Sequence, residues 1–147
     1  MRHNLIILLI ATIALTSALS VADDPQKAEA KPENKLVGSW KLVSARYGGQ
    51  EVTFPAGTTR IKHVTPTQFM WAIYDNDGVV DEVLGGPYTL KDDHYEEIPE
   101  YGKSLIKRLK GMPQSFTWKI EGNKWHHNGK LSSGLMIEEV WERVETK

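Results

Sequence analysis

The sequence predicts an all-β fold, a closed or nearly closed antiparallel meander barrel of about eight to ten strands with one short helix. From Leu36 onward, segments of about 5 to 10 residues are rich in β-branched and aromatic side chains, and turn signals separate them every 8 to 12 residues or so, as in barrels and sandwiches. Closing such a sheet removes its exposed edges and leaves a lumen. A two-sheet sandwich of the same strands is the alternative.

Nine strands are predicted from this pattern, and we take them in chain order. They are Leu36–Tyr47, Thr59–Thr65, Gln68–Tyr74, Val79–Leu84, Tyr88–Lys91, Tyr95–Ile98, Ser115–Glu121, Lys124–Lys130 and Leu135–Glu145. The connecting sequences Asn76–Gly78, Gly85–Pro87 and Gly122–Asn123 favour tight reversals, so successive strands should pair antiparallel. One helix is predicted at Ser104–Lys110, because apolar residues gather on one side of it and Gly111 follows.

The N-terminal segment has the pattern of an export signal. Residues 1–22 begin with basic residues, continue through the apolar run Leu5–Leu15 and end in small residues. Because that run is shorter than the roughly 20 apolar residues of a membrane-spanning helix, we expect a cleavable signal peptide and a secreted or periplasmic protein. Residues 23–35 are charged and lack bulky apolar side chains, which predicts a flexible linker. The barrel domain is then expected over residues 36–146.

The composition excludes several partners. Eighteen Lys and Arg against nineteen Asp and Glu leave a formal charge of −1, too little for general nucleic-acid binding. The chain has no Cys, which excludes disulfides, thiolate metal sites and a lipid-bearing Cys after the signal. We therefore expect no nucleic acid and no stable membrane anchor after signal cleavage. The oligomeric state is left open.

Catalytic and metal motifs are weak. His126 and His127 are adjacent on a predicted strand, so they point to opposite faces and cannot bind one ion together. The acidic residues between Asp92 and Glu100 could hold a carboxylate pair for acid–base chemistry, but charge runs usually lie in solvent, as we expect here. The sequence has neither a Gly-x-Ser-x-Gly nucleophile elbow nor a phosphate-binding loop. We expect no metal and no cofactor.

The two ends of the predicted barrel carry a familiar pattern. Gly38-Ser39-Trp40 stands on the first strand and Arg143 near the end of the last. With the strand count, this pattern resembles the lipocalin and fatty-acid-binding-protein superfamily, in particular the small lipocalin-like domains of uncharacterised secreted bacterial proteins. The resemblance implies that Trp40 packs at the closed end of the barrel with Arg143 across its ring. A guanidinium over an indole gains about 0.5 to 2 kcal/mol, and the first and last strands meet in this way only if the sheet closes.

The chain also departs from the best-known branches of that superfamily. Residues 48–58 are too few for the two helices that fatty-acid-binding proteins place there, so their ligands are not transferred. Helices form a lid in those proteins. By resemblance, Leu105, Ile106 and Leu109 could cover the open end while nearby lysines attract an anionic ligand or a lipid surface. The alternative is an ordinary surface crossover.

Six residues are predicted to contact a ligand in the lumen: Trp40, His63, Trp71, Tyr88, Trp118 and Arg143. Each has a structural alternative, because aromatic residues at strand spacing usually form core and a lone His is usually a satisfied structural residue. For Arg143 we weigh a purely structural contact with Trp40, with Glu139 near solvent, against a second role in which Arg143 faces a ligand carboxylate.

Period-two alternation predicts which neighbours share these faces. An inward Trp40 places Leu42 and Ser44 inside with it. On the last strand, Ile137, Glu139 and Trp141 share the face of Arg143.

These observations lead to one expectation and two alternatives. We expect a secreted barrel that binds a small hydrophobic or amphipathic molecule in its lumen without catalysis. One alternative is a barrel enzyme or haem-binding barrel that uses His63 or interior carboxylates. The other is a protein-interaction barrel with a filled interior.

Overall fold

The computed structural model describes residues 33–145. The expected signal peptide at residues 1–22 and residues 23–32 of the expected linker lie outside this part of the chain. Within residues 33–145 no helix has the length and apolar character needed to cross a membrane.

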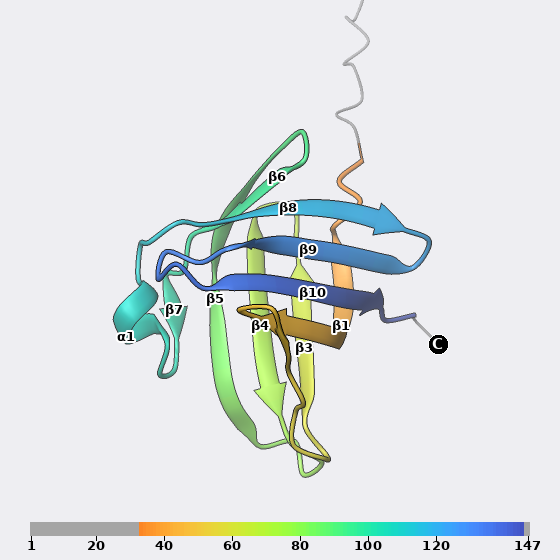
Figure 1. The fold of residues 1–147 in the computed structure, drawn as a ribbon, viewed down its shortest axis with the longest axis vertical. Coiled ribbons are helices and arrows are strands. Elements are labelled where there is room, and N and C mark those ends of the chain that lie inside the picture. The colour runs from red at the N-terminus through yellow and green to blue at the C-terminus, as the bar shows by residue number, and fades with distance from the viewer. Residues whose placement is uncertain (1–32, 146–147) are drawn as a thin grey trace, which may run out of the picture. The chain divides into compact units, whose positions relative to one another are not determined.

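A single antiparallel sheet of ten strands wraps into a barrel (Figure 1). The strands are β1 (Gly38–Tyr47), β2 (Gln50–Glu51), β3 (Thr59–Val64), β4 (Gln68–Tyr74), β5 (Val80–Lys91), β6 (His94–Glu97), β7 (Tyr101–Gly102), β8 (Gln114–Glu121), β9 (Lys124–Lys130) and β10 (Met136–Arg143). Eight of them form the wall in the order β10-β9-β8-β6-β5-β4-β3-β1, while β2 pairs with β1 and β7 with β5. Along this wall, each strand lies beside the wall strand that precedes or follows it in the chain, which confirms the predicted meander.

Pairing of β1 with β10 closes the barrel. The register runs from Trp40 opposite Arg143 to Tyr47 opposite Ile137. This ladder joins the first and last strands of the domain, so the barrel prediction is confirmed over the sandwich alternative.

Two predicted strands are one strand in the structure. Val79–Leu84 and Tyr88–Lys91 merge into β5, and Gly85–Pro87 continues the strand instead of reversing it. The glycines serve close packing: a Cβ on Gly86 would collide with the carbonyl oxygen of Ile98, and one on Gly85 would meet the ring of Tyr101. The predicted turn was wrong because glycine marks a close approach of backbone as well as a reversal.

The predicted helix is present but shorter. Helix α1 spans Ile106–Leu109 and has no side-chain hydrogen bond at its N-cap, Leu105. It lies beside the end of the barrel at which β8 and β10 begin (Figure 1). The segment after it turns back at Gly111, whose φ is +70° and whose N–H bonds to Pro99 O.

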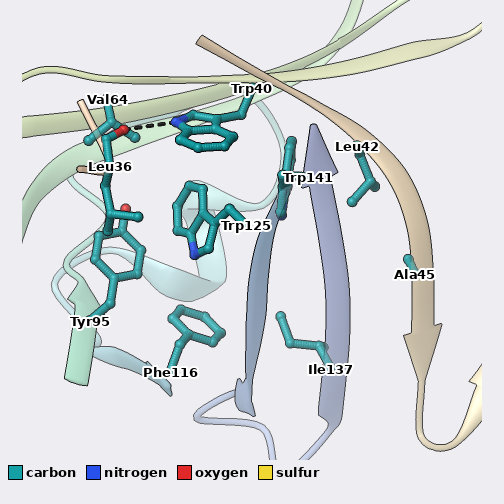
Figure 2. Packing of buried hydrophobic residues seen from close by; sticks show 10 residues of the cluster. All are labelled: Leu36, Trp40, Leu42, Ala45, Val64, Tyr95, Phe116, Trp125, Ile137 and Trp141. Carbon is teal, nitrogen blue, oxygen red and sulfur yellow. Dashed lines mark hydrogen bonds between the residues drawn. The ribbon is translucent and has the colours of Figure 1, made fainter. Parts of the chain in front are cut away.

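Aromatic side chains fill the opposite end. The rings of Trp40 and Trp125 meet edge to face at 5.5 Å between centroids, and Trp141 lies 6.4 Å from Trp125. Figure 2 shows these three indoles packed together, with Tyr95 and Phe116 alongside. All five are buried, so this part of the barrel is solid core.

The closed end of the barrel is covered by residues at the start of β1 and at the end of β10. Arg143 lies over the Trp40 ring, 4.1 Å from the guanidinium carbon to the ring centroid. Its Nη1 and Nη2 donate hydrogen bonds to the carbonyl oxygens of Val37 and Lys35. Trp40 in turn donates its Nε1–H to Leu36 O at 2.8 Å, the dashed bond in Figure 2. The structure thus contains the Trp40–Arg143 contact that the resemblance implied.

A bulge in β1 changes which side chains face inward. The pairing with β10 shifts between Leu42 and Ser44, which leaves Val43 as the extra residue. Leu42 is inside as predicted, but Ser44 is exposed and Ala45 takes the inward position instead. The expectation for Ser44 was therefore wrong, because one inserted residue reverses the alternation beyond it. Tyr47 reaches the lumen by the same shift.

Candidate functional site

A cavity of about 520 Å³ occupies the half of the barrel between the aromatic core and α1. Leu105, Leu109 and Met112 cover it from the helix side, while Phe116 and Trp141 form its inner wall. The other lining residues are Tyr47, Arg60, Lys62, Trp71, Leu84, Glu97, Arg108, Gln114, His127, Leu131, Ser132, Ser133, Leu135, Ile137 and Glu139. The lining is mainly apolar with a few polar groups, which is the usual character of a small-molecule site.

Helix α1 and its N-cap residue contribute to this site through one face, because Leu105, Arg108 and Leu109 are spaced three and four residues apart. Leu105 and Leu109 line the cavity, as the lid interpretation expected, and Arg108 lines it as well. Ile106 is not among the lining residues.

Glu139 is the centre of the polar part of the lining. Its Oε1 accepts a hydrogen bond from Tyr47 Oη at 2.7 Å and lies 3.5 Å from Arg60 Nη1. Its Oε2 accepts from Trp141 Nε1 at 3.0 Å and lies 3.1 Å from His127 Nδ1. Glu139 is buried, so the expectation that it lies near solvent was wrong. The alternation that places it inside with Ile137 and Trp141 is confirmed.

The surroundings of Glu139 keep it ionised. Burial by itself opposes the charge, but the hydrogen bond with His127, the charge of Lys62 and the hydrogen bond from Tyr47 outweigh burial and lower the pKa of Glu139 from 4.5 to about 2. Burial, together with the negative charge of Glu139, raises the pKa of the Tyr47 phenol, which therefore stays protonated and donates.

His127 is held neutral next to this carboxylate. Burial and the nearby charge of Lys62 lower its pKa below 6.5, against the opposite effect of Glu139. In the neutral ring, a proton on Nδ1 satisfies Glu139 and leaves Nε2 as an acceptor. Nε2 is buried and has no partner among the described residues. His126 faces the other side of β9 and contacts Glu121, so the prediction that the two histidines point apart is confirmed.

A second buried ion pair lies deeper in the barrel. Lys62 Nζ is 2.7 Å from Glu97 Oε1, and both side chains are almost fully buried. The ammonium also lies 5.0 Å from the Trp125 ring and 4.9 Å from the Trp141 ring. Glu97 belongs to the acidic stretch that we expected to be solvated. That expectation was wrong for Glu97, because Lys62 supplies a buried counter-charge across the lumen.

Arg60 links the polar lining to the aromatic side chains. Its guanidinium carbon lies 5.2 Å from the Phe54 ring centroid and 5.0 Å from that of Trp71. Its Nη1 donates to Tyr47 Oη at 2.6 Å. Its Nε is buried and has no partner among residues 33–145.

Of the six residues predicted to contact a ligand, the structure places Trp71 in the cavity lining. Trp40 and Arg143 lie at the closed end, where hydrogen bonds to backbone carbonyls occupy the guanidinium. Tyr88 also lies there and donates to Thr65 O. Trp118 packs against the aromatic core and borders a shallow depression on the outside.

His63 does not face the lumen. The inward residues of β3 are Arg60, Lys62 and Val64, and His63 pairs instead with Ser39, at 2.8 Å from Nδ1 to Oγ. The prediction that His63 contacts a ligand in the lumen was therefore wrong, because the other alternating set of β3 faces inward. The buried carboxylates favour this set, since they require cations inside.

Sequence reasoning missed Tyr47, Arg60, Lys62 and His127 as lining residues. Alternation within one strand offers two faces and does not by itself show which of them is inward. The available signal was the pairing of charges between strands, because Glu139, on a predicted inward position, needs a basic partner inside the barrel.

Neither a protein-family model nor a curated protein matches this sequence. Among solved structures, a lipocalin-like protein from Bacteroides uniformis superposes with a TM-score of 0.54 at 15% identity, over 74% of this chain and 98% of that chain. The domain has a lipocalin-like fold.

More distant neighbours have lower scores. The tryptamine complex of the amine binding protein of Rhodnius prolixus has a TM-score of 0.48 at 11% identity, over 79% of this chain and 68% of that one. A fatty acid transporter has a TM-score of 0.42 at 10% identity, over 76% and 98%.

Proposed function

We propose that this lipocalin-like protein is a secreted carrier that binds one small hydrophobic or amphipathic molecule in its lumen without catalysing a reaction. The cavity supports this proposal most directly, because its volume of about 520 Å³ lies in the range of roughly 300 to 1,000 Å³ typical of small-molecule sites. Export is supported by the sequence pattern of residues 1–22.

The two alternatives have less support. A protein-interaction barrel was expected to be filled, and the cavity argues against that. The haem-binding alternative relied on an inward His63, which instead lies on the outer face. The enzyme alternative relied on His63 or on interior carboxylates, and the interior carboxylates of Glu97 and Glu139 are held in ion pairs.

Native mass spectrometry of the mature protein purified from its own host, without refolding, tests the proposal. We expect the protein to carry a small molecule at one copy per chain, and we expect this molecule to be lost on denaturation. A Leu131→Trp variant should lose the molecule, because Leu131 lines the cavity and the larger ring would fill part of it. Thr117→Trp, at an exposed position outside the barrel, is the matched control. A bare wild-type protein that also fails to bind alkyl probes added in solution would overturn the proposal.

A further inference from the structure

The Glu139 carboxylate of the cavity is already fully engaged. Glu139 receives Tyr47 and Arg60 on one oxygen and His127 and Trp141 on the other. A carboxylate offers about four acceptor sites, so this one has none left for a ligand. Its role toward the lumen is to hold these four side chains in position.

The second ion pair of the lining and the side-chain amide of Gln114 also have partners within the protein. Lys62 neutralises Glu97 at 2.7 Å. Gln114 donates to Met112 O and Ser132 Oγ, and its Oε1 accepts from Ser132 N. These groups shape the cavity but leave little unmatched charge.

The arginines, by contrast, keep unused donors. Among the side chains that the structure describes, Arg60 hydrogen-bonds only through Nη1, although a guanidinium has five N–H groups. The rings of Phe54 and Trp71 near this guanidinium shield it from water. Arg108 also lines the cavity and makes no ion pair within residues 33–145.

The charge balance of the lining points the same way. Arg60, Lys62 and Arg108 are cations, whereas Glu97 and Glu139 are the anions. With neutral His127, the lining carries an excess of one positive charge. Electrostatic attraction is stronger in such a partly dry cavity than in water, so this excess favours a negative ligand group.

We propose that the ligand is an amphiphile with an anionic head group, such as a carboxylate, whose head contacts Arg60 while its apolar part lies against Trp71, Leu109 and Ile137. This proposal rests on the proposed function and adds the chemical class of the ligand. Arg108, on the covering helix, adds positive charge on the helix side of the same cavity.

Three probes with the same alkyl chain test the head group on the wild-type protein. Decanoate, decanol and decylammonium are titrated at low salt and neutral pH, with calorimetry as the readout and tryptophan fluorescence as a check, because Trp71 and Trp141 line the cavity. We expect decanoate to bind at least about tenfold more tightly than decanol, and decylammonium more weakly than both. Equal binding of decanoate and decanol, or tighter binding of decylammonium, would overturn the anionic head group but leave the carrier proposal intact. Failure of all three would count against the carrier proposal itself.

An Arg60→Met variant locates the head group. It should retain decanol binding and reduce the preference for decanoate to about threefold or less, since Met keeps the apolar stem and removes the charge. Arg46→Gln is the matched control, because Arg46 is an exposed arginine on the outer face beside Glu138, and it should keep the full preference. If Arg60→Met folds and keeps the full preference, the assignment to Arg60 is wrong. If it does not fold, Arg60→Gln, which keeps polar N–H groups and removes the charge, replaces it and should likewise reduce the preference for decanoate. A folded Arg60→Gln that keeps the full preference would show that the assignment to Arg60 is wrong.

Discussion

Replacing Glu139 with Gln should destabilise the barrel by about 3 kcal/mol at neutral pH. The carboxylate accepts hydrogen bonds from Tyr47, His127 and Trp141 and faces Arg60. An amide has only one acceptor oxygen, so its NH₂ group would meet two of these donors. Breaking a buried charge pair usually costs about 3 to 5 kcal/mol.

The pKa of Glu139 leads to a similar magnitude. It falls from 4.5 to about 2 on folding, and each pH unit of such a shift is worth about 1.4 kcal/mol. Because the folded-state pKa is the lower one, the unfolded chain takes up the proton first as the pH falls. The stabilisation is therefore complete above about pH 4.5 and is lost between pH 4.5 and about 2.

Urea unfolding followed by circular dichroism at a series of pH values measures both effects. The free-energy difference between wild type and Glu139→Gln should be about 3 kcal/mol at pH 7 and should shrink as the pH falls below 4.5. Glu138→Gln is the control: Glu138 points outward to an exposed partner at 3.6 Å and should change stability by less than about 1 kcal/mol. A Glu139→Gln protein as stable as wild type at pH 7, or a difference that does not vary with pH, would refute the reasoning.

Three further changes test other parts of the structure. Gly86→Ala should destabilise the barrel by about 1 to 3 kcal/mol in urea unfolding, because the new methyl group would collide with the carbonyl oxygen of Ile98. An unchanged midpoint would show that the two segments can separate freely. Arg143→Met should cost about 1 to 3 kcal/mol through loss of its contact with Trp40 and of two hydrogen bonds, while ligand binding in calorimetry stays the same. Loss of binding from a folded Arg143→Met protein would instead support a ligand contact. In NMR, the His127 ring should titrate below pH 6.5, so its contribution to stability is complete above that pH and declines as the pH falls through the folded-state pKa. A titration at or above pH 6.5 would contradict the neutral buried ring.

The fold could be predicted well from local pattern. Strand spacing, turn residues and the pair Trp40 and Arg143 at the two ends were enough to predict a closed meander, because each depends on short-range geometry or on a single contact. The errors fall where local pattern is ambiguous. Gly85 and Gly86 have the composition of a turn, yet they lie inside β5, where neighbouring segments leave no room for a Cβ.

The candidate site was predicted less well, and β1 and β3 show why. The bulge at Val43 moves Tyr47 into the lumen and Ser44 out of it, and alternation counted along the sequence cannot register an inserted residue. On β3 the inward set contains Arg60 and Lys62, which are favourable inside only because carboxylates from other strands face them.

The amino-acid sequence alone determined the antiparallel meander, since strand propensity, turn chemistry and the order of strands are properties of neighbouring residues, and the resemblance at Trp40 and Arg143 favoured its closure over a sandwich. Only the tertiary structure decided that half of the barrel is solid with aromatic rings while the other half holds a cavity with arginines in its lining. The physical reason is that the balance of buried charge and the volume left between side chains depend on residues brought together from distant strands, and no single segment contains that information.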